Sequence, residues 1–456
     1  MMKFWAALPL MVAALGVVSF GQQTQPSVGV DINTGASFPI DNNAQPPPKE
    51  WIDKDTGHRV VRLSDEPGSS SLYFHQYAFS PDATKLAFTS PTGIYQVDLN
   101  TRQIELILAG STSQFTQGNM RSSISMIQVG RKTGRIYYTK SEYHEGESPF
   151  TAARSVWWID PVTKEQHEIG ELPRGVNVGT VNCDETLLAG AVTYLDGRGG
   201  AATRPVMARR GQRINLEDRW SQHLPMALVT MDTSTGEIKT FNPSNDWDNH
   251  FQFSPTDPTL LMYCHEGPWH LNDRVWTIRT DGTDLFKVHT RTMINEIWGH
   301  EFWSGDGRTA WFQLYQPRAV RSVGGETSVG WVAGYNFDTQ QETWYLNAPN
   351  TESIHVNVSK DGSMFAGDGG NSAPWIFLFR PHKDEILNED LVKTAYDTSH
   401  LIQPGYFESE RLVNLSHHNY SLEPNPVFTP DGKWVIFRSN MFGPSYAFMV
   451  EVAKAG

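Results

Sequence analysis

The chain is 456 residues long, and its 50 Asp and Glu residues outnumber its 37 Lys and Arg residues, which gives a formal net charge of -13. An acidic surface repels nucleic acid and anionic membranes, so neither is an expected partner. Cys183 and Cys264 are the only cysteines, so a domain of this size must be held by its core, whether or not the two thiols meet.

Residues 1–21 have the pattern of a secretory signal peptide. Lys3 is the only charge, and it precedes an apolar run that ends in small residues. We therefore expect an exported protein, periplasmic or secreted, whose mature chain begins at Gln22. An uncleaved N-terminal anchor is the alternative interpretation. No other segment approaches the roughly 20 apolar residues of a membrane span.

Residues 22–50 are polar and rich in proline and glycine, as in TGASFP and AQPPPKE. Such a composition cannot bury a core, so we expect a disordered leader or linker. From Trp51 onward, short runs of alternating apolar and polar residues lie between turn residues, and few stretches have a helical period. This pattern is typical of an all-β fold, and we predict that residues 51–456 form one domain.

One phrase recurs along this domain: an apolar strand, a polar turn that is often Asp-Gly, and a second apolar strand. Examples are YAFSPDATKLAFTS, FQFSPTDPTLLMYC and PVFTPDGKWVIFRS. The seven copies begin at Tyr77, Met126, Val178, Phe251, Glu301, Val356 and Pro426. Most are followed by a further strand pair, and four strands every roughly 40 to 70 residues is the period of a β-propeller blade. The sequence therefore predicts a seven-bladed β-propeller.

Residues 58–65, HRVVRLSD, form an early strand that the first blade does not need. Because the last copy of the phrase leaves room for about three strands, we predict that this N-terminal strand completes the last blade and closes the ring. Two insertions are expected to form walls of a cleft: residues 195–224, rich in Arg and Gly, and residues 382–410, with a partly helical pattern.

The residues just before the repeated phrases are unusually polar. In a propeller the innermost strands begin on one face, so these residues gather around one mouth of the central channel. They are His75, Gln76, Asn249, His250, Gly299, His300, His355, Glu423 and Asn425. A single histidine at a strand start is usually an ordinary loop residue, but four of the seven starts carry one.

Imidazole together with carboxylate or amide oxygen suits a divalent ion such as Mn²⁺, and a remaining neutral histidine can act as a general base. The chain has no GxSxG nucleophile elbow, no HExxH helix and no glycine-rich phosphate loop after a strand. Covalent hydrolysis, zinc-peptidase and nucleotide chemistry therefore lack their usual sequence support.

Several phrases resemble those of the oligogalacturonate lyase family, seven-bladed propeller enzymes that cleave short pectic oligosaccharides by β-elimination. The most specific are FSPTDPTLLMYCHEGPWHLNDRVWTIRTDG and HEFWSGDG, and weaker ones are YFHQYAFSPD, NVGTVNCDETLLAG and SIHVNVSKDGSMFAGDG. The resemblance covers the body from about His58 onward. It implies an exported polysaccharide lyase that acts on oligogalacturonate or a related uronate oligosaccharide, with a metal ion and a histidine base.

The resemblance also assigns roles by position. His300 in HEFW matches a family metal ligand, and His250 matches the general base. Residues expected on the substrate side are His265, Trp269, Arg274, His355 and Arg438. Trp269 is included because an aromatic ring can stack on a sugar, although most of the 15 tryptophans are expected between blades. Arg438 has an alternative role, a structural salt bridge with Glu423.

The chain departs from the family pattern at two places. Where better known members place a QxxHxH metal motif, it reads YSLEPN, so Glu423 and Asn425 would offer oxygen to Mn²⁺ or Ca²⁺. The stretch PMALVTMD, which matches the position of the family's catalytic arginine, contains none. Arg219 or Arg213 in the first insertion is the candidate replacement.

A second hypothesis comes from a different class of protein, a non-catalytic TolB-like periplasmic propeller that binds glycans or proteins. The YSLEPN replacement and the acidic surface favour it. Metal content separates the two hypotheses, because a binding module needs no stoichiometric ion in the funnel.

Overall fold

The computed structural model describes residues 28–30, 37–39, 46–112, 122–142, 153–194, 216–317, 328–383 and 402–455. The predicted signal peptide, residues 1–21, lies outside these ranges. Within them, no helix has the length and the apolar character that crossing a bilayer requires.

The described residues form β-strands almost throughout, with one short helix, α1 (Leu216–Trp220), so the predicted all-β class is confirmed. After β3 (Glu50–Ile52) and β4 (His58–Arg62), which belong to the last sheet, the next sheet consists of β5 (Lys85–Ser90), β6 (Gly93–Asp98) and β7 (Ile104–Ala109). The sheet that follows consists of β8 (Ser122–Val129), β9 (Ile136–Glu142), β10 (Ala153–Ile159) and β11 (Gln166–Leu172). The sheet after that consists of β12 (Val176–Val181), β13 (Leu187–Thr193), β14 (Met226–Asp232) and β15 (Ile238–Ser244). The next sheet consists of β16 (Trp247–Phe253), β17 (Leu260–Glu266), β18 (Val275–Arg279) and β19 (Phe286–Lys287).

An eight-stranded sheet follows, in the order β20 (Ile297–Trp303), β21 (Thr309–Pro317), β22 (Ser328–Asn336), β23 (Gln341–Leu346), β27 (Ile402–Asn414), β26 (Trp375–Lys383), β25 (Phe365–Gly367) and β24 (Val356–Val358). The last large sheet has the order β28 (Val427–Phe428), β29 (Trp434–Ser439), β30 (Tyr446–Lys454), β4 (His58–Arg62) and β3 (Glu50–Ile52). In this sheet β4 pairs antiparallel with β30, and Val60 lies opposite Val450. The eight-stranded sheet contains the one parallel pair of the described strands, β23 with β27.

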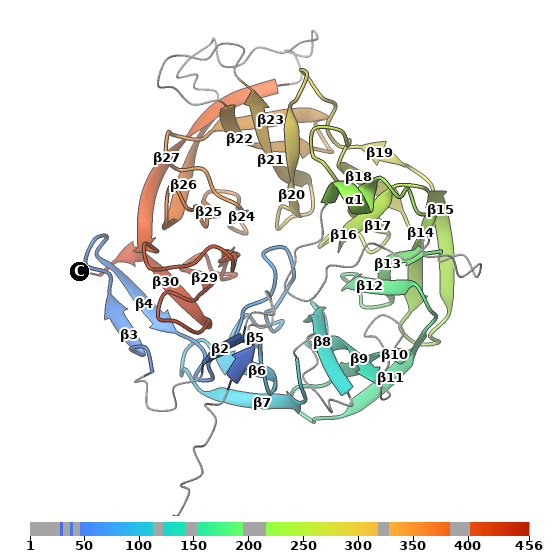
Figure 1. Ribbon diagram of the computed structural model, residues 1–456, viewed down its shortest axis with the longest axis horizontal. Helices are drawn as coiled ribbons and strands as arrows, with labels where there is room; N and C mark the ends of the chain where they lie inside the picture. Colours follow the sequence, from blue (N-terminus) through green and yellow to red (C-terminus); the bar gives the residue numbers. More distant parts are fainter. Residues whose placement is uncertain are drawn as a thin grey trace, which may run out of the picture.

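The sheets are arranged in a ring around a central region, as in a propeller (Figure 1). Strands β8, β12, β16, β20 and β24 lie nearest the middle, whereas β7, β11, β15 and β27 lie at the rim. The chain between β4 and β5 runs toward the middle of the ring. The starts of the inner strands are therefore close to one another although they are remote in sequence.

Apolar side chains fill the space between neighbouring sheets. One cluster joins Ile127 of β8 and Tyr137 of β9 to Val178 of β12 and Val229 of β14, and all four are at most 4% exposed. Burying such a side chain contributes about 1.5 to 3 kcal/mol. Alternation of apolar residues in each strand thus holds adjacent sheets together and fixes the ring.

Amide side chains of the inner strands link adjacent sheets near the axis. Gln128 Nε2 donates to the carbonyl oxygen of Val181 over 2.7 Å, and Gln252 Nε2 donates to that of Glu301 over 2.8 Å. Both glutamines are buried, so these bonds also satisfy polar groups that would otherwise be costly. Glutamine in an inner strand therefore fixes the spacing of neighbouring sheets.

The repeated turn is built in the same way in different sheets. After β20, Ser304 Oγ donates to Asp306 Oδ1 over 2.6 Å, and after β28 Thr429 Oγ1 donates to Asp431 Oδ1 over the same distance. Gly307 follows in the first turn with a φ of 70°, in the left-handed region that favours glycine. The turn residues thus determine where each inner strand ends.

The predicted leader contains one strand pair, β1 (Val28–Val30) with β2 (Ser37–Pro39). Of the insertion at residues 195–224, the structure describes residues 216–224, which begin with α1. The insertion at residues 382–410 begins and ends in strands β26 and β27, so its ends are not helical, and residues 384–401 lie outside the described ranges. Both cysteines are free thiols, and Cys264 is buried.

Candidate functional site

His250 and His300 occupy matching β-bulges in adjacent sheets. The pairing of β16 with β17 shifts between Asn249 and Gln252, and that of β20 with β21 shifts in the same way just after Gly299. The two histidines have φ angles of 52° and 51°, which are rare for residues with a Cβ. Such a conformation costs on the order of 1 to 3 kcal/mol and persists only when the surroundings impose it. Bulges of this kind redirect a side chain next to an active site.

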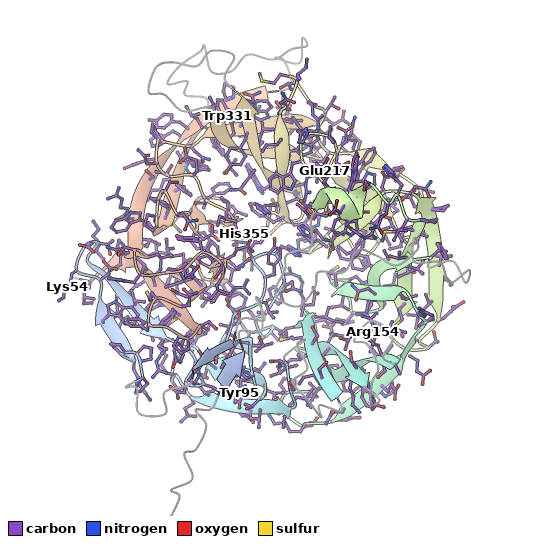
Figure 2. All side chains as sticks on the ribbon, viewed as in Figure 1. Lys54, Tyr95, Arg154, Glu217, Trp331 and His355 are labelled. Carbon is purple, nitrogen blue, oxygen red and sulfur yellow. The ribbon has the colours of Figure 1, made fainter. Side chains whose placement is uncertain are left out.

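Four histidines from remote parts of the chain gather at the starts of the inner strands. This group, the histidine cluster, consists of His75, His250, His300 and His355. The ring centroids of His300 and His355 are 4.5 Å apart, and those of His75 and His250 are 6.0 Å apart. Tyr73 joins the two pairs, because its ring lies 5.2 Å from His355 and 5.8 Å from His250. Figure 2 shows His355 close to the middle of the ring.

Three members of the cluster are neutral imidazoles. Burial, assisted by repulsion from neighbouring histidines, lowers the pKa of His75, His300 and His355 to about 3. A neutral imidazole can bind a metal ion or accept a proton, whereas an imidazolium can do neither. The environment therefore keeps these three rings in the form that metal binding needs.

Hydrogen bonds orient two of these rings. Nδ1 of His300 lies 2.8 Å from Gln313 Oε1, and Nδ1 of His355 lies 3.0 Å from Asp368 Oδ2. An oxygen acceptor at Nδ1 takes up the N–H of the ring, which leaves Nε2 as the free lone pair. Nε2 of His355 is 3.1 Å from the Tyr73 hydroxyl. Second partners of this kind are typical of metal-binding histidines.

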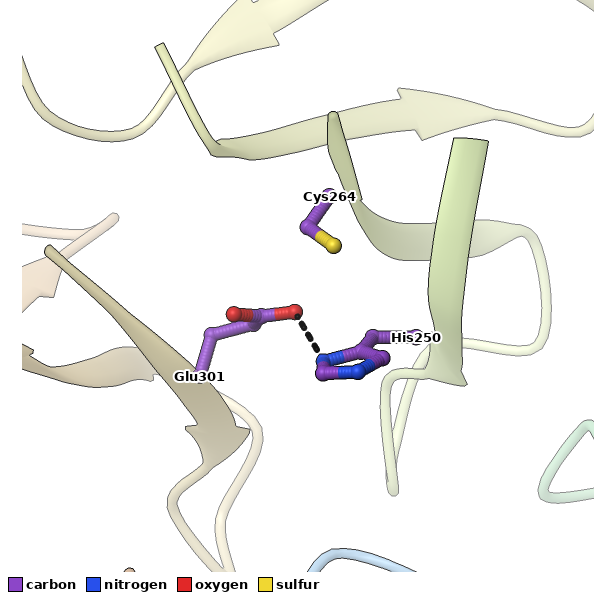
Figure 3. A group of neighbouring side chains, drawn as sticks. All are labelled: His250, Cys264 and Glu301. Carbon is purple, nitrogen blue, oxygen red and sulfur yellow. Dashed lines mark ion pairs between the residues drawn. The ribbon is translucent and has the colours of Figure 1, made fainter. Parts of the chain in front are cut away.

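His250 has a different environment, between two carboxylates. Its Nδ1 lies 3.3 Å from Glu301 Oε1, shown in Figure 3, and its Nε2 lies 3.6 Å from Glu266 Oε2. Burial alone would lower the pKa of His250, but Glu301 and then Glu266 outweigh it, and the pKa is raised. In turn, burial would raise the pKa of Glu301, yet His250 and Arg274 hold it at about 2. Neither carboxylate oxygen of Glu301 has a hydrogen-bond partner among the described residues.

The predicted metal ligands only partly come together. Glu423 Oε2 lies 3.8 Å from Nε2 of His355, next to His300. Asn425 is buried, and its amide is committed to the backbone, because Oδ1 accepts from Phe74 N and Nδ2 donates to Glu423 O. The Asn425 side chain therefore holds the chain around Glu423 rather than facing the rings.

A different trio of possible ligand residues comes together in the described chain. Nitrogen, sulfur and oxygen of His250, Cys264 and Glu301 lie within 4.8 Å of one another, and Figure 3 shows the thiol directed toward the other two. The guanidinium of Arg274 lies 3.7 Å from Cys264 Sγ. A positive charge at that distance opposes a cation, so this trio is better suited to holding a proton between His250 and Glu301.

Arg274 and Trp269 are positioned behind the cluster. Arg274 is 1% exposed, and it pairs with Glu266 and lies 4.6 Å from the Trp269 ring centroid. The charge of Arg274 is therefore paired inside the protein with Glu266, which it keeps ionised beside His250. Trp269 packs edge-on against His300 with centroids 4.8 Å apart, so it supports a cluster residue directly.

His265 points away from the cluster. Cys264 and Glu266 of β17 face His250, and successive side chains of a strand point to opposite faces. His265 instead lies 5.1 Å from the Trp276 ring and 3.6 Å from Asp248 Oδ1. In the sequence CHE, the alternation of side chains along a strand already predicts that His265 faces away from Cys264 and Glu266.

Of the three other predicted arginines, Arg213 lies outside the described residues, and Arg219 and Arg438 are buried. Arg219 of α1 is 7% exposed and lies 4.9 Å from the ring of Trp247, at the start of the strand that carries His250. Arg438 is 6% exposed, and its Nε donates to the carbonyl oxygen of Glu423 over 2.7 Å. Arg438 therefore supports the chain that carries Glu423, while Arg219 supports the wall beside β16.

Sequence reasoning missed two groups that complete the site. Tyr73 lies two residues before His75, within the quoted phrase YFHQY, and its hydroxyl meets His355. Asp368 is fully buried, and burial raises its pKa to about 7. Only the pairing of β24 with β25 brings Asp368 to His355, so no local motif could have identified it.

Two proteins of known family resemble this chain over most of its length. An oligogalacturonate lyase of Dickeya dadantii (strain 3937) is 25% identical over 417 residues, which span 88% of this chain and 95% of that protein. An oligogalacturonide lyase of Pectobacterium atrosepticum is 25% identical over 421 residues, with the same coverage.

Two solved structures have the same fold. A structure described as an oligogalacturonate lyase in complex with manganese has a TM-score of 0.64 at 21% identity, and one from Vibrio parahaemolyticus has a TM-score of 0.64 at 20% identity. Each comparison covers 89% of this chain and 96% of the other. The family model described as oligogalacturonate lyase matches residues 217–455, more than half of the sequence. The chain therefore belongs to the oligogalacturonate lyase family, a family of lyase enzymes.

Proposed function

We propose that this protein cleaves oligogalacturonate, or a related uronate oligosaccharide, by metal-assisted β-elimination in which His250 removes the proton. The observation that carries the proposal is the histidine cluster, in which four imidazoles from remote strands meet in a chain of this family. The relatives named above act on oligogalacturonate by their descriptions. A uronate substrate suits this site, because the site offers three neutral imidazoles and one histidine, His250, that lies between two carboxylates.

The reaction needs two kinds of group. The proton at C5 of a uronic acid residue is too weakly acidic while the neighbouring carboxylate keeps its full negative charge. A bound divalent cation supplies Lewis acidity at that carboxylate, worth several kcal/mol as negative charge develops. A histidine then accepts the proton, and the 4-linked sugar leaves to give an unsaturated uronate.

The donor set supports a divalent ion of borderline character. Nε2 of His300 and of His355 would bind it, because Gln313 and Asp368 orient the two rings from behind. The carboxylate of Glu423 would add an oxygen ligand, since it already approaches His355. Two nitrogens and one oxygen favour Mn²⁺ over Ca²⁺, which prefers oxygen alone.

His250 is best placed to be the base. Glu301 faces Nδ1 at 3.3 Å and would stabilise the imidazolium that forms when Nε2 takes a proton. Glu266 lies near Nε2, but Arg274 compensates its charge. Glu301 thus corresponds to the carboxylate that orients a histidine base in other enzymes.

We also propose the finer architecture and the location that the sequence predicts. The eight-stranded sheet divides at the parallel contact of β23 with β27 into two four-stranded units, which would bring the ring to seven blades. The pairing of β4 with β30 supports closure of the ring by the N-terminal strand. The signal-like residues 1–21 support export to the periplasm or the medium.

Product formation tests the proposed activity. Incubating the full mature chain with di- and trigalacturonate should raise the ultraviolet absorbance of a conjugated unsaturated uronate. EDTA should abolish the rise, and added Mn²⁺ should restore it. If EDTA has no effect on product formation, a metal-independent elimination replaces this proposal; if no uronate oligosaccharide gives product, the lyase assignment itself fails.

A further inference from the structure

A polar cavity occupies the end of the inner strands opposite the histidine cluster. It has a volume of about 200 Å³ and extends from the segment around His75 and Tyr77 to the turns that follow β16, β20, β24 and β28. The histidine cluster lies at the starts of these strands and the cavity opens among the turns at their ends. His75 and its neighbour Phe74 form the boundary between the two regions.

The charge of this cavity is opposite to that of the whole protein. Arg131 and Lys360 are among its lining residues, and none of the described residues that line it is Asp or Glu. The chain has a formal net charge of -13, so two cations without a carboxylate in one cavity are unexpected. The local potential therefore favours an anion.

Arg131 is the more informative of the two cations. Its guanidinium lies 3.9 Å from the centroid of the Tyr77 ring, and no described carboxylate forms an ion pair with it. Arg131 is half-buried, and this burial lowers its pKa. A partly desolvated guanidinium without a counter-charge is costly unless a ligand supplies that charge.

Other polar groups of the cavity already have partners. Gln128 and Gln252 link adjacent sheets, as described above, and the Asn357 amide donates to the carbonyl oxygen of Phe74. The carboxylates of the neighbouring turns, such as Asp306, accept bonds within their own turns. The groups that remain for a ligand are therefore chiefly the two cations.

We propose that this cavity is a second binding site, for a small carboxylate anion up to the size of a single sugar acid, held by Arg131 and Lys360. Arg131 forms the inner contact, because it is fixed against Tyr77, and a guanidinium matches the two oxygens of a carboxylate. Lys360 is exposed and closes the outer side. The site involves no catalytic step, so it stands apart from the proposed lyase activity.

Calorimetric titration of the full chain tests this site with D-galacturonate, acetate and the neutral sugar D-galactose as probes. We expect galacturonate or acetate to bind and galactose not to bind. Comparing the two acids identifies the source of the carboxylate: binding of both points to any small carboxylate, and binding of galacturonate alone points to a sugar acid. Equal binding of galactose, or no binding of either acid, would overturn the proposal.

Variants locate the bound anion. Arg131→Gln should weaken binding by about tenfold or more, and Lys360→Gln by a smaller factor, because each removes a charge-assisted contact. Lys433→Gln is the matched control, since Lys433 is exposed in an equivalent turn and pairs with Asp431 outside the cavity. Lys360→Gln decides the outcome if Arg131→Gln does not fold.

A third variant separates the cavity from the histidine cluster. His300→Ala should retain galacturonate binding in the cavity while it loses the proposed lyase activity. If His300→Ala abolishes binding and the Arg131 and Lys360 variants do not, the sugar acid binds at the cluster and the second site is refuted.

Discussion

Each of the two imidazoles at the centre of the site is oriented by one side chain. Gln313 serves His300, and Asp368 serves His355. The oxygen at Nδ1 determines which nitrogen carries the hydrogen, and so determines whether Nε2 can bind a metal ion. Asp368 also accepts from the backbone N–H of His355, which fixes it in place.

Replacing Asp368 should therefore weaken metal binding without changing any ligand. In Asp368→Asn the amide can present its NH₂ to Nδ1 of His355, which would place the ring hydrogen on Nε2. We expect Mn²⁺ affinity to fall by roughly 10- to 100-fold, measured by titration calorimetry. Asp361→Asn, in an exposed turn of the same sheet, is the control. Unchanged Mn²⁺ affinity in Asp368→Asn would remove His355 from the proposed ligands.

His289 should make stability depend on pH. It is 1% exposed between Glu296 and Glu342, at 2.9 Å from each, and although burial would lower its pKa, the two carboxylates raise it to about 9. Because the folded pKa exceeds the unfolded value of about 6.5, the stabilisation is complete below that pH and is lost as pH rises through about 9.

We expect the free energy of unfolding, from urea titrations at pH 6 and pH 9.5, to fall by an amount on the order of 3 kcal/mol in the wild type. His289→Gln should be less stable at pH 6 and should show a much smaller difference between the two pH values. The same pH difference in both proteins would contradict a protonated His289.

The sequence identified the four histidines because each precedes a copy of the same phrase. It could not identify Tyr73 or Asp368, which reach the cluster only through the packing of other elements. The predicted roles of His265 and Arg274 rested on their positions in phrases that resemble the family. Strand alternation separates His265 from the cluster, whereas the burial of Arg274 depends on its pairing with Glu266, which no pattern reveals.

At the scale of single elements, the site depends on two bulges. Strands β16 and β20 each insert a histidine with positive φ, and this turns the ring away from the regular alternation. The segments NHFQF and GHEFW do not differ from ordinary strands in composition. The sequence therefore predicts the strands and their turns but not the bulges, because a bulge depends on how the neighbouring strand pairs.

Gly299 tests the second bulge. A Cβ at this position would lie 2.7 Å from Nε of Arg274 and 3.2 Å from the Trp269 ring, and Arg274 is held by Glu266. Gly299→Ala should therefore lower the free energy of unfolding by about 1 to 3 kcal/mol, measured by urea denaturation, and displace the rings beside it. Gly370→Ala, where a Cβ meets nothing within 4 Å, should have little effect. Equal stability of the two variants would show that the contact at Gly299 is not constrained.

At the scale of the whole molecule, repetition explains how the candidate site forms from distant residues. Four copies of the phrase place a histidine in the cluster, and the sheets that carry them are arranged around the middle of the ring (Figure 1). The all-β class and the propeller-like ring followed from that repetition. The parallel contact of β23 with β27 did not follow from the repetition. It joins two sheets across an insertion that has no strand pattern of its own.

The same repetition gives the ring two different ends. Strand starts carry the histidine cluster, and strand ends carry the turns around Arg131 and Lys360. The first end provides neutral imidazoles and carboxylates, and the second provides positive charge. One chain thus presents two separate polar regions along a single axis.

Formation of unsaturated product by His250→Gln tests the central claim most directly. The account predicts a loss of at least about 100-fold in the rate on trigalacturonate, because a positioned base contributes that much or more, with Mn²⁺ affinity and thermal unfolding unchanged. His167→Gln, an exposed histidine against Trp158 at the rim, should keep the wild-type rate. A wild-type rate in His250→Gln would contradict the account, since the proton would then be removed by another group.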